Sequence, residues 1–341
     1  MRLHRKEIKK AGALALVLFF GLGASVFPFP APSYPQLPAA DRIRLAEAFR
    51  IAWKYKNKVW ENWSKAPFAV LLVTPTGEFL VRHPKPSDEF APFVYDTILK
   101  AGILHRKVRF PENLLATFPA VNGVSTIVVG QPENVSKSSA EWVLALLHEH
   151  FHQLQMSQPG YFAEVESLGL AGGDQTGRWM LEYPFPYDSA RVNEAFAELG
   201  HLLLDGLSAP ERELTLKVLA YLEARKRFQE RLSINDYKYF SFQLWQEGVA
   251  RYTEHRMAEL VAGTYKPTER FRALLDFTSF RVVADSIKRG ILAGLSGLDL
   301  QRQRRVGFYY LGAGEALLLD RVNPHWQKQY FKNKFFIEKY F

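Results

Sequence analysis

Residues 144–153 read LALLHEHFHQ, an apolar run that ends in histidine and glutamate side chains. We expect this run to be helical, and residues four apart on a helix lie on one face. His148 and His152 can therefore bind one metal ion through their imidazole nitrogens. Glu149 can then reach a water at the metal as a general base. His150 is offset from both histidines and is expected to pack within the helix. The HExxH pattern fixes few positions, so its meaning depends on the rest of the chain.

The segment before this helix predicts a strand that leads into it. Residues 125–130 favour β-structure, and we expect this strand to have a free edge on which an extended chain could pair. Ser138 and Glu141 have the spacing of a capping box, in which two side chains satisfy backbone amides reciprocally. The helix is therefore expected to start there and to stop before the Pro-Gly pair at 159–160.

Two patterns lie further upstream. Residues 41–63 carry apolar residues at helical spacing, among them Trp53, and predict an amphipathic helix that packs on the domain. Residues 68–73 and 78–82 favour β-structure and flank a Thr-Pro-Thr-Gly turn, which predicts a hairpin.

Downstream of residue 160 the chain is predicted to be mostly helical. Residues 160–190 are rich in Gly, Pro and aromatic residues and are expected to form a loop or lid. Helical patterns resume over 193–207, 211–231 and 239–262. The predicted fold class is therefore α+β, predominantly helical, with a small N-terminal mixed sheet.

The N-terminus has the pattern of an export signal. Basic residues within 1–10 precede an apolar run over 11–27, so residues 1–27 predict a signal peptide or an N-terminal anchor. Residues 28–40 form a proline-rich linker. We expect an exported chain that is periplasmic, extracellular or tethered to the outer face of a membrane by this segment, with residues 41–341 as the folded domain.

Composition excludes several kinds of site. The 341 residues include no cysteine, which excludes disulfides, thiolate zinc ligands and a cysteine nucleophile. The net charge is +9, but much of it belongs to the basic residues of the export segment. The remaining basic residues form no patch that the sequence reveals, so we expect no nucleic-acid partner.

A hydrolytic zinc site with two histidines needs a third protein ligand, often a carboxylate. The first candidate is Glu247, in LWQEGVARYTE over residues 244–254. With the HExxH stretch, this segment resembles the paired signature of the gluzincin metallopeptidases, most closely the membrane alanyl aminopeptidase family, in which that Glu completes the zinc site. Glu194 is the competing candidate, because NEAFAE over 193–198 resembles a zinc-binding helix of thermolysin-like enzymes.

A third segment extends the resemblance. Residues 308–313 read FYYLGA, and Tyr309 stands three residues before Gly312, as does the family's oxyanion-stabilising Tyr. The resemblance implies that role for Tyr309, with Tyr310 as the alternative. A phenol suits the task because it donates a hydrogen bond to developing negative charge without carrying a charge itself.

Two departures from the family limit what is carried over. Residues 153–246 separate the second histidine from Glu247, a gap that a helical insertion over about 160–238 would explain. The family's acid that holds a substrate amino terminus has no counterpart in FPAVNGV at 118–124. The resemblance therefore does not extend to aminopeptidase specificity.

The sequence thus predicts an exported zinc metallopeptidase with a thermolysin-like catalytic domain, acting on peptides or proteins. One Zn²⁺ per chain would be bound by His148, His152 and Glu247, with Glu149 as base and Tyr309 at the oxyanion. The alternative is a non-catalytic, zinc-containing scaffold or binding protein of the cell envelope. A purely structural site, however, has no need of Glu149 or Tyr309.

Overall fold

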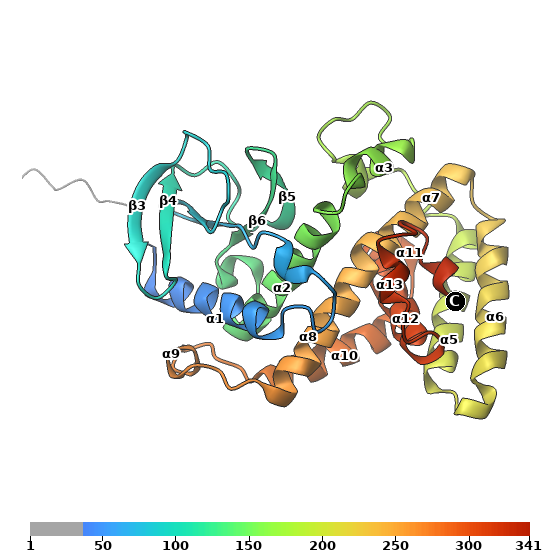
Figure 1. The fold of residues 1–341 in the computed structure, drawn as a ribbon. Coiled ribbons are helices and arrows are strands. Elements are labelled where there is room, and N and C mark those ends of the chain that lie inside the picture. The colour runs from blue at the N-terminus through green and yellow to red at the C-terminus, as the bar shows by residue number, and fades with distance from the viewer. Residues whose placement is uncertain (1–36) are drawn as a thin grey trace, which may run out of the picture. The chain divides into compact units, whose positions relative to one another are not determined.

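The computed structural model describes residues 37–341, so the predicted targeting segment and most of the predicted linker lie outside the described residues. The described chain is α+β and mostly helical, with one small mixed sheet, as predicted. In Figure 1 the sheet and α1 (Ala39–Tyr55) lie at the left, and α5 (Ala190–Ser208), α6 (Glu211–Gln229) and α12 (Val306–Val322) lie at the right. Between them lie α2 (Ser139–Met156) and α8 (Val249–Thr264). Within residues 37–341 no helix is both long and apolar enough to span a membrane.

The predicted hairpin and the predicted strand at 125–130 are both present. β1 (Val70–Thr74) pairs antiparallel with β2 (Gly77–Val81), and β6 (Val124–Gly130) runs parallel to β1. The sheet has six strands in the order β3-β4-β2-β1-β6-β5. The expected free edge at 125–130 is wrong, because β6 lies between β1 and β5.

The other three strands were not predicted. They are β3 (Ala91–Asp96), β4 (Ala101–Arg106) and β5 (Leu115–Val121). Pro92 and Pro119 interrupt the two edge strands, and the pairing register of each strand shifts near its proline. Proline lacks the amide that a ladder needs, so it is tolerated at edges and bulges but weakens a strand prediction.

Helix α2 (Ser139–Met156) carries the HExxH pattern and is almost entirely buried. Ser138 and Glu141 form the predicted capping box at its start. Trp142 Nε1 donates to the carbonyl of Gly130 at 2.9 Å, and Gln153 Nε2 donates to the carbonyl of Ala69 at 2.9 Å. Both ends of the helix are thus bonded to strand ends, which fixes it against the sheet.

Helix α1 (Ala39–Tyr55) ends earlier than the predicted boundary at residue 63. Asn57 and Asn62 adopt left-handed backbone conformations, with φ of 61° and 63°, which a continuing helix does not allow. The predicted orientation of Trp53 is also wrong, because this side chain is 71% exposed.

The remaining chain is helical. The predicted helices at 193–207 and 211–231 correspond to α5 (Ala190–Ser208) and α6 (Glu211–Gln229). The predicted helix at 239–262 is broken by a π-helical turn, and the predicted loop at 160–190 contains two short helices, so both predictions need correction. The other helices are α3 (Tyr161–Ser167), α4 (Trp179–Glu182), α7 (Ile234–Gln243), α8 (Val249–Thr264), α9 (Glu269–Arg272), α10 (Phe280–Ser296), α11 (Leu300–Gln303), α12 (Val306–Val322) and α13 (Gln327–Tyr330), the π-helical turn is Leu244–Gly248, and the 3₁₀ turns are Trp63–Lys65, Pro132–Val135 and Ile337–Tyr340.

Candidate metal centre

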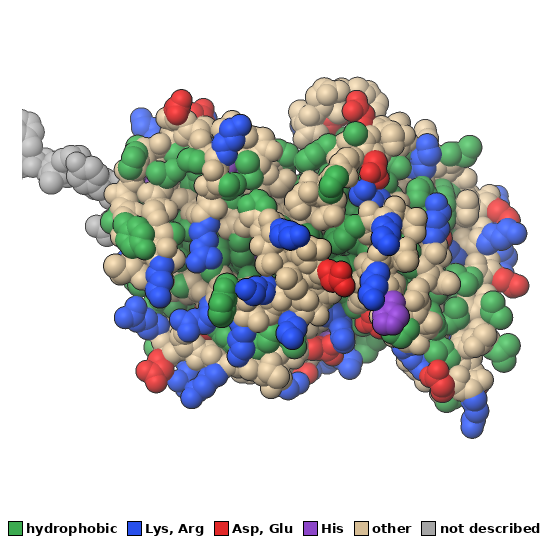
Figure 2. All heavy atoms as spheres, viewed as in Figure 1, with side chains coloured by type: hydrophobic (Ala, Val, Ile, Leu, Met, Phe, Trp, Pro, Cys, Tyr) green, Lys and Arg blue, Asp and Glu red, His purple; other side chains and the backbone are tan. Residues whose placement is uncertain are grey.

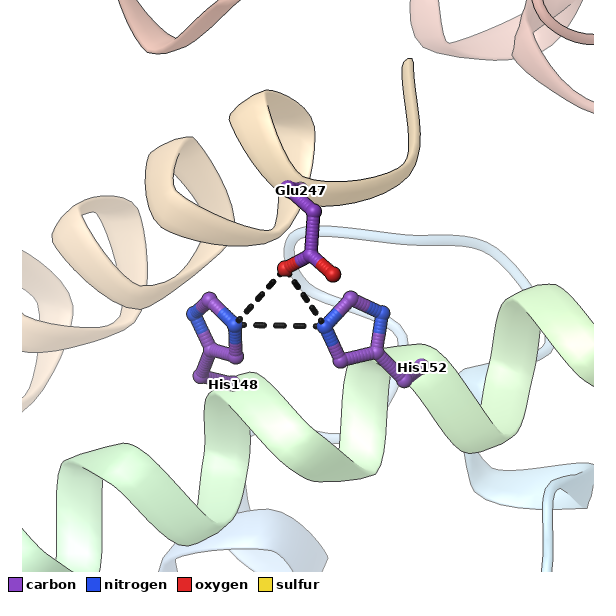
Figure 3. Close-up of side chains that lie close together, drawn as sticks. All are labelled: His148, His152 and Glu247. Atoms are coloured by element: carbon purple, nitrogen blue, oxygen red, sulfur yellow. Dashed lines mark hydrogen bonds and ion pairs between the residues drawn. The ribbon is translucent and has the colours of Figure 1, made fainter. Parts of the chain in front are cut away.

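Three side chains from two helical segments converge on one point. His148 and His152 project from α2, and Glu247 projects from the π-helical turn that precedes α8 (Figure 3). The two Nε2 atoms lie 3.2 Å apart, and Glu247 Oε2 lies 3.4 Å from that of His152 and 4.0 Å from that of His148. Three ligand atoms within 4.8 Å of one another could hold a metal ion. Two imidazole nitrogens and one carboxylate oxygen are a donor set that suits zinc.

The Nδ1 atom of each imidazole has a polar partner, and these contacts direct the Nε2 atoms toward the shared point. His148 Nδ1 lies 3.5 Å from Glu254 Oε2, and Glu254 in turn pairs with Arg251 at 2.6 Å. His152 Nδ1 lies 2.6 Å from Gln155 Oε1. A proton on each Nδ1 leaves the Nε2 lone pair free for a metal, the arrangement found around histidine ligands.

The orientation of Gln155 follows from its other contacts. Its amide nitrogen lies 3.0 Å from the carbonyl oxygen of Gln246 and 2.6 Å from the hydroxyl of Tyr330. Because these contacts occupy the nitrogen side, the amide oxygen faces His152. Gln155 and Glu254 therefore contact the outer nitrogens of the two imidazoles, and Gln246 Nε2 also lies 3.1 Å from Nδ1 of His152.

Without a metal, the charges of the group are balanced by a proton. Burial alone would lower the pKa of His152, but the Glu247 carboxylate outweighs it and raises this pKa to about 9. Burial alone would raise the pKa of Glu247, but the His152 imidazolium lowers it to about 2. Both directions have one cause, which is the close approach of the His152 imidazole and the Glu247 carboxylate.

Glu149 lies beside the group and is bonded to the sheet edge. Its Oε2 lies 2.8 Å from the hydroxyl of Thr117, which is on β5. The side chain is buried, and one carboxylate oxygen is held by this contact. Sequence reasoning missed Thr117 because it did not predict β5.

Tyr309, on α12 in the C-terminal part of the chain, reaches the same point. Its ring lies nearly parallel to that of His148, with the centroids 6.5 Å apart. Arg305 Nη1 donates to the Tyr309 hydroxyl oxygen at 2.8 Å and lies 3.4 Å from Glu247 Oε1. Burial, together with the Glu247 carboxylate, raises the pKa of Tyr309 well above its ordinary value, so the phenol keeps its proton. Sequence reasoning missed Arg305, although it stands one helical turn before Tyr309.

Two glycines set the distance between Glu247 and Tyr309. A Cβ on Gly248 would lie 2.5 Å from Gly312 Cα, and a Cβ on Gly312 would lie 2.7 Å from the carbonyl oxygen of Leu244. The π-helical turn and α12 thus meet backbone to backbone, and any side chain there would separate them. π-helical turns of this kind are frequent at functional sites.

Comparisons of the chain with family models, with curated proteins and with solved structures found no match. The chemistry of the group therefore has to be inferred from its own geometry.

The structure places the competing candidates away from the group. Glu194 is exposed on α5 and is not part of the converging set. The ring of Tyr310 packs over Gly294 of α10. His150 stacks on Phe68 with the centroids 4.1 Å apart, in agreement with its expected packing role.

Proposed function

We propose that this protein is a zinc-dependent peptidase that hydrolyses peptide bonds. The observation that carries the proposal is the convergence of His148, His152 and Glu247 next to a buried carboxylate and a protonated phenol. A site that only stabilised the fold would need the three ligands but neither Glu149 nor Tyr309. We further propose that the small sheet above α2 and the helical part after it form a thermolysin-like catalytic domain.

Zinc, when bound by these residues, would supply a Lewis acid that activates water and polarises a carbonyl. Glu149 accepts the proton of the attacking water and delivers it to the leaving amine. Its contact with Thr117 orients the carboxylate and leaves the second oxygen available for the proton.

Tyr309 stabilises the oxyanion of the tetrahedral intermediate. The Arg305 guanidinium donates to a lone pair of the phenol oxygen. The phenol hydrogen therefore points away from Arg305 and can be donated to the oxyanion. A neutral donor fixed in this way meets the charge as it develops, without any reorganisation of solvent.

The test is digestion of a peptide library by the purified full chain, with and without a zinc chelator, together with metal analysis. We expect about one zinc per chain and hydrolysis that the chelator abolishes. Glu149→Gln should keep zinc and lower the rate by roughly 100-fold or more. Glu194→Gln, the same change at an exposed carboxylate, is the matched control and should leave both unchanged. Undiminished hydrolysis by the Glu149 variant would remove the proposed base, and a zinc-loaded chain without any hydrolysis would favour the scaffold alternative.

A further inference from the structure

A basic surface lies over the C-terminal half of α1 and continues onto the end of α8 and the start of α10. Figure 2 shows Lys and Arg side chains gathered in the region of α1 and α9, with hydrophobic side chains between them. We call this surface the basic face. Its exposed side chains are Arg50, Lys54, Lys56, Lys58, Lys266 and Arg281, together with Trp53 and Val282.

Contacts between the three segments make this face continuous. Lys54 Nζ lies 3.3 Å from the carbonyl oxygen of Thr264 at the end of α8 and 5.4 Å from the ring centroid of Tyr265. Arg281 Nη2 donates to the carbonyl oxygen of Ala262 at 3.4 Å. Four of the six basic residues lie within residues 50–58, and the contacts with α8 and α10 add Lys266 and Arg281 to the same patch.

The basic side chains of this face lack the close ion-pair partners that basic residues have elsewhere on α1. On the N-terminal half of α1, Arg42 pairs with Asp96 and Arg44 pairs with Asp41. Within residues 37–341, by contrast, none of the basic side chains of the face has a carboxylate within salt-bridge distance. The α1 acid on this side, Glu47, is buried and accepts hydrogen bonds from Tyr265 and Thr268. Glu61, Glu269 and Asp285 are exposed on the same segments, but the six basic side chains outnumber them. The face therefore keeps an excess of positive charge, which suits an anionic partner.

Trp53 distinguishes this face from a purely charged one. It is 71% exposed, and the ammonium of Lys56 lies 5.2 Å from its ring centroid. A large aromatic ring turned to solvent adds little to the folding of its own domain. Trp flanked by Lys is instead typical of side chains at the headgroup level of a membrane, where one end is apolar and the other wet.

We propose that the basic face docks the folded domain on an anionic lipid surface, with Trp53 among the headgroups and the Lys and Arg side chains against lipid phosphates. Lipid is favoured over single-stranded nucleic acid because a single Trp gives no series of stacking platforms for successive bases. The contact is peripheral and is independent of the proposed peptidase activity. It would hold the domain with the basic face against the bilayer.

The test is co-sedimentation of the full chain with phosphatidylcholine vesicles that contain or lack phosphatidylglycerol. Combined Lys54→Ser, Lys56→Ser and Lys58→Ser should weaken binding to the anionic vesicles by roughly 100-fold, because each basic side chain near such a surface contributes about fivefold. Combined Lys85→Ser, Lys107→Ser and Lys226→Ser is the matched control, since it removes the same charge from exposed positions of other elements. Binding to phosphatidylcholine alone, to which an apolar N-terminal segment would contribute, should be the same in all variants.

A second variant tests the lipid assignment. Trp53→Ser leaves the net charge unchanged and should weaken binding to the anionic vesicles several-fold. Equal losses in the face variant and the matched control would overturn the proposal, because net charge alone would then explain binding. Undiminished binding by the Trp53 variant would also overturn it, since the face would then be a site for any polyanion. Circular dichroism confirms folding in each case, and all the changed side chains are exposed.

Discussion

Two buried clusters of ionisable side chains in the helical part of the protein differ in where their positive charge comes from. In the Arg225 cluster, Arg225 donates to Glu315 at 2.6 Å and to Glu338 at 3.1 Å. Tyr221 and Tyr237 donate to the same two carboxylates. In the group of His148, His152 and Glu247, the chain supplies ligand atoms that point at one another.

We infer from this difference that the first cluster is structural and that the second binds a metal ion. Burying a carboxylate is costly unless a cation stays beside it, and Arg225 is a permanent cation built into the fold. At the group of His148, His152 and Glu247, we expect the cation to be exchangeable, because a bound metal ion would replace a proton on His152. One cluster should therefore determine stability and the other metal affinity.

The strongest test of this comparison is removal of a carboxylate from the metal group. Glu247→Ala should lower zinc affinity by more than the roughly 10–100-fold expected for an outer partner, because a direct ligand is lost. Competition with a chromogenic chelator measures the affinity. Glu194→Ala is the control, and release of metal by that variant alone would show that the third ligand had been assigned to the wrong helix.

The corresponding change in the other cluster should act on folding. Arg225→Met leaves Glu315 buried without its cation, and should lower the free energy of unfolding by about 3–5 kcal/mol. Urea denaturation measures it, and zinc content per folded chain should not change. Arg227→Met removes an exposed partner of Glu198 and should cost no more than about 1 kcal/mol. Similar losses in both variants would contradict the structural role of the buried pair.

The three side chains that converge could be predicted from the sequence, but their surroundings could not. His148 and His152 are set by helical spacing, which is a local property, and Glu247 was suggested by a resemblance. Thr117 and Arg305 belong to no motif and reach the group only through tertiary packing. Their roles depend on distances between segments, which spacing along the chain does not encode.

The same distinction holds for the fold. Helix α2 and the first hairpin were predictable because a capping box and a tight turn are local signals. The edge strands β3 and β5 were not, since Pro92 and Pro119 break the local pattern. Neighbouring strands nevertheless complete the pairing there. For the basic face, the cluster at 50–58 is local in the sequence, but its extension by Lys266 and Arg281 was not predictable, because α1, α8 and α10 meet only in the folded chain.

Helix α12 connects the two clusters, and a substitution at its closest contact should affect both. It carries Tyr309 at the metal group and Glu315 at the Arg225 cluster. Gly248→Ala would place a methyl group against Gly312, push α12 away and lower the free energy of unfolding by about 1–3 kcal/mol. Zinc affinity should fall as well. Gly263→Ala, at a helical glycine with no close neighbour, is the control. A Gly248 variant with both properties unchanged would show that this close approach does not position α12.

Glu254 belongs to both kinds of cluster, so it offers the finest test of the comparison. It pairs with Arg251, as in the structural cluster, and it also lies 3.5 Å from Nδ1 of His148. Burial would raise the pKa of Glu254, but Arg251 and His148 hold it well below its ordinary value. Glu254→Gln keeps the shape of the side chain and removes its charge, and should lower zinc affinity about 10–100-fold by loosening the orientation of His148.

Glu198→Gln on the surface of α5 is the control for the Glu254 variant. Stability should change less than in Arg225→Met, because Arg251 is partly exposed and retains water. A loss of stability without a loss of zinc affinity would place Glu254 with the structural cluster alone.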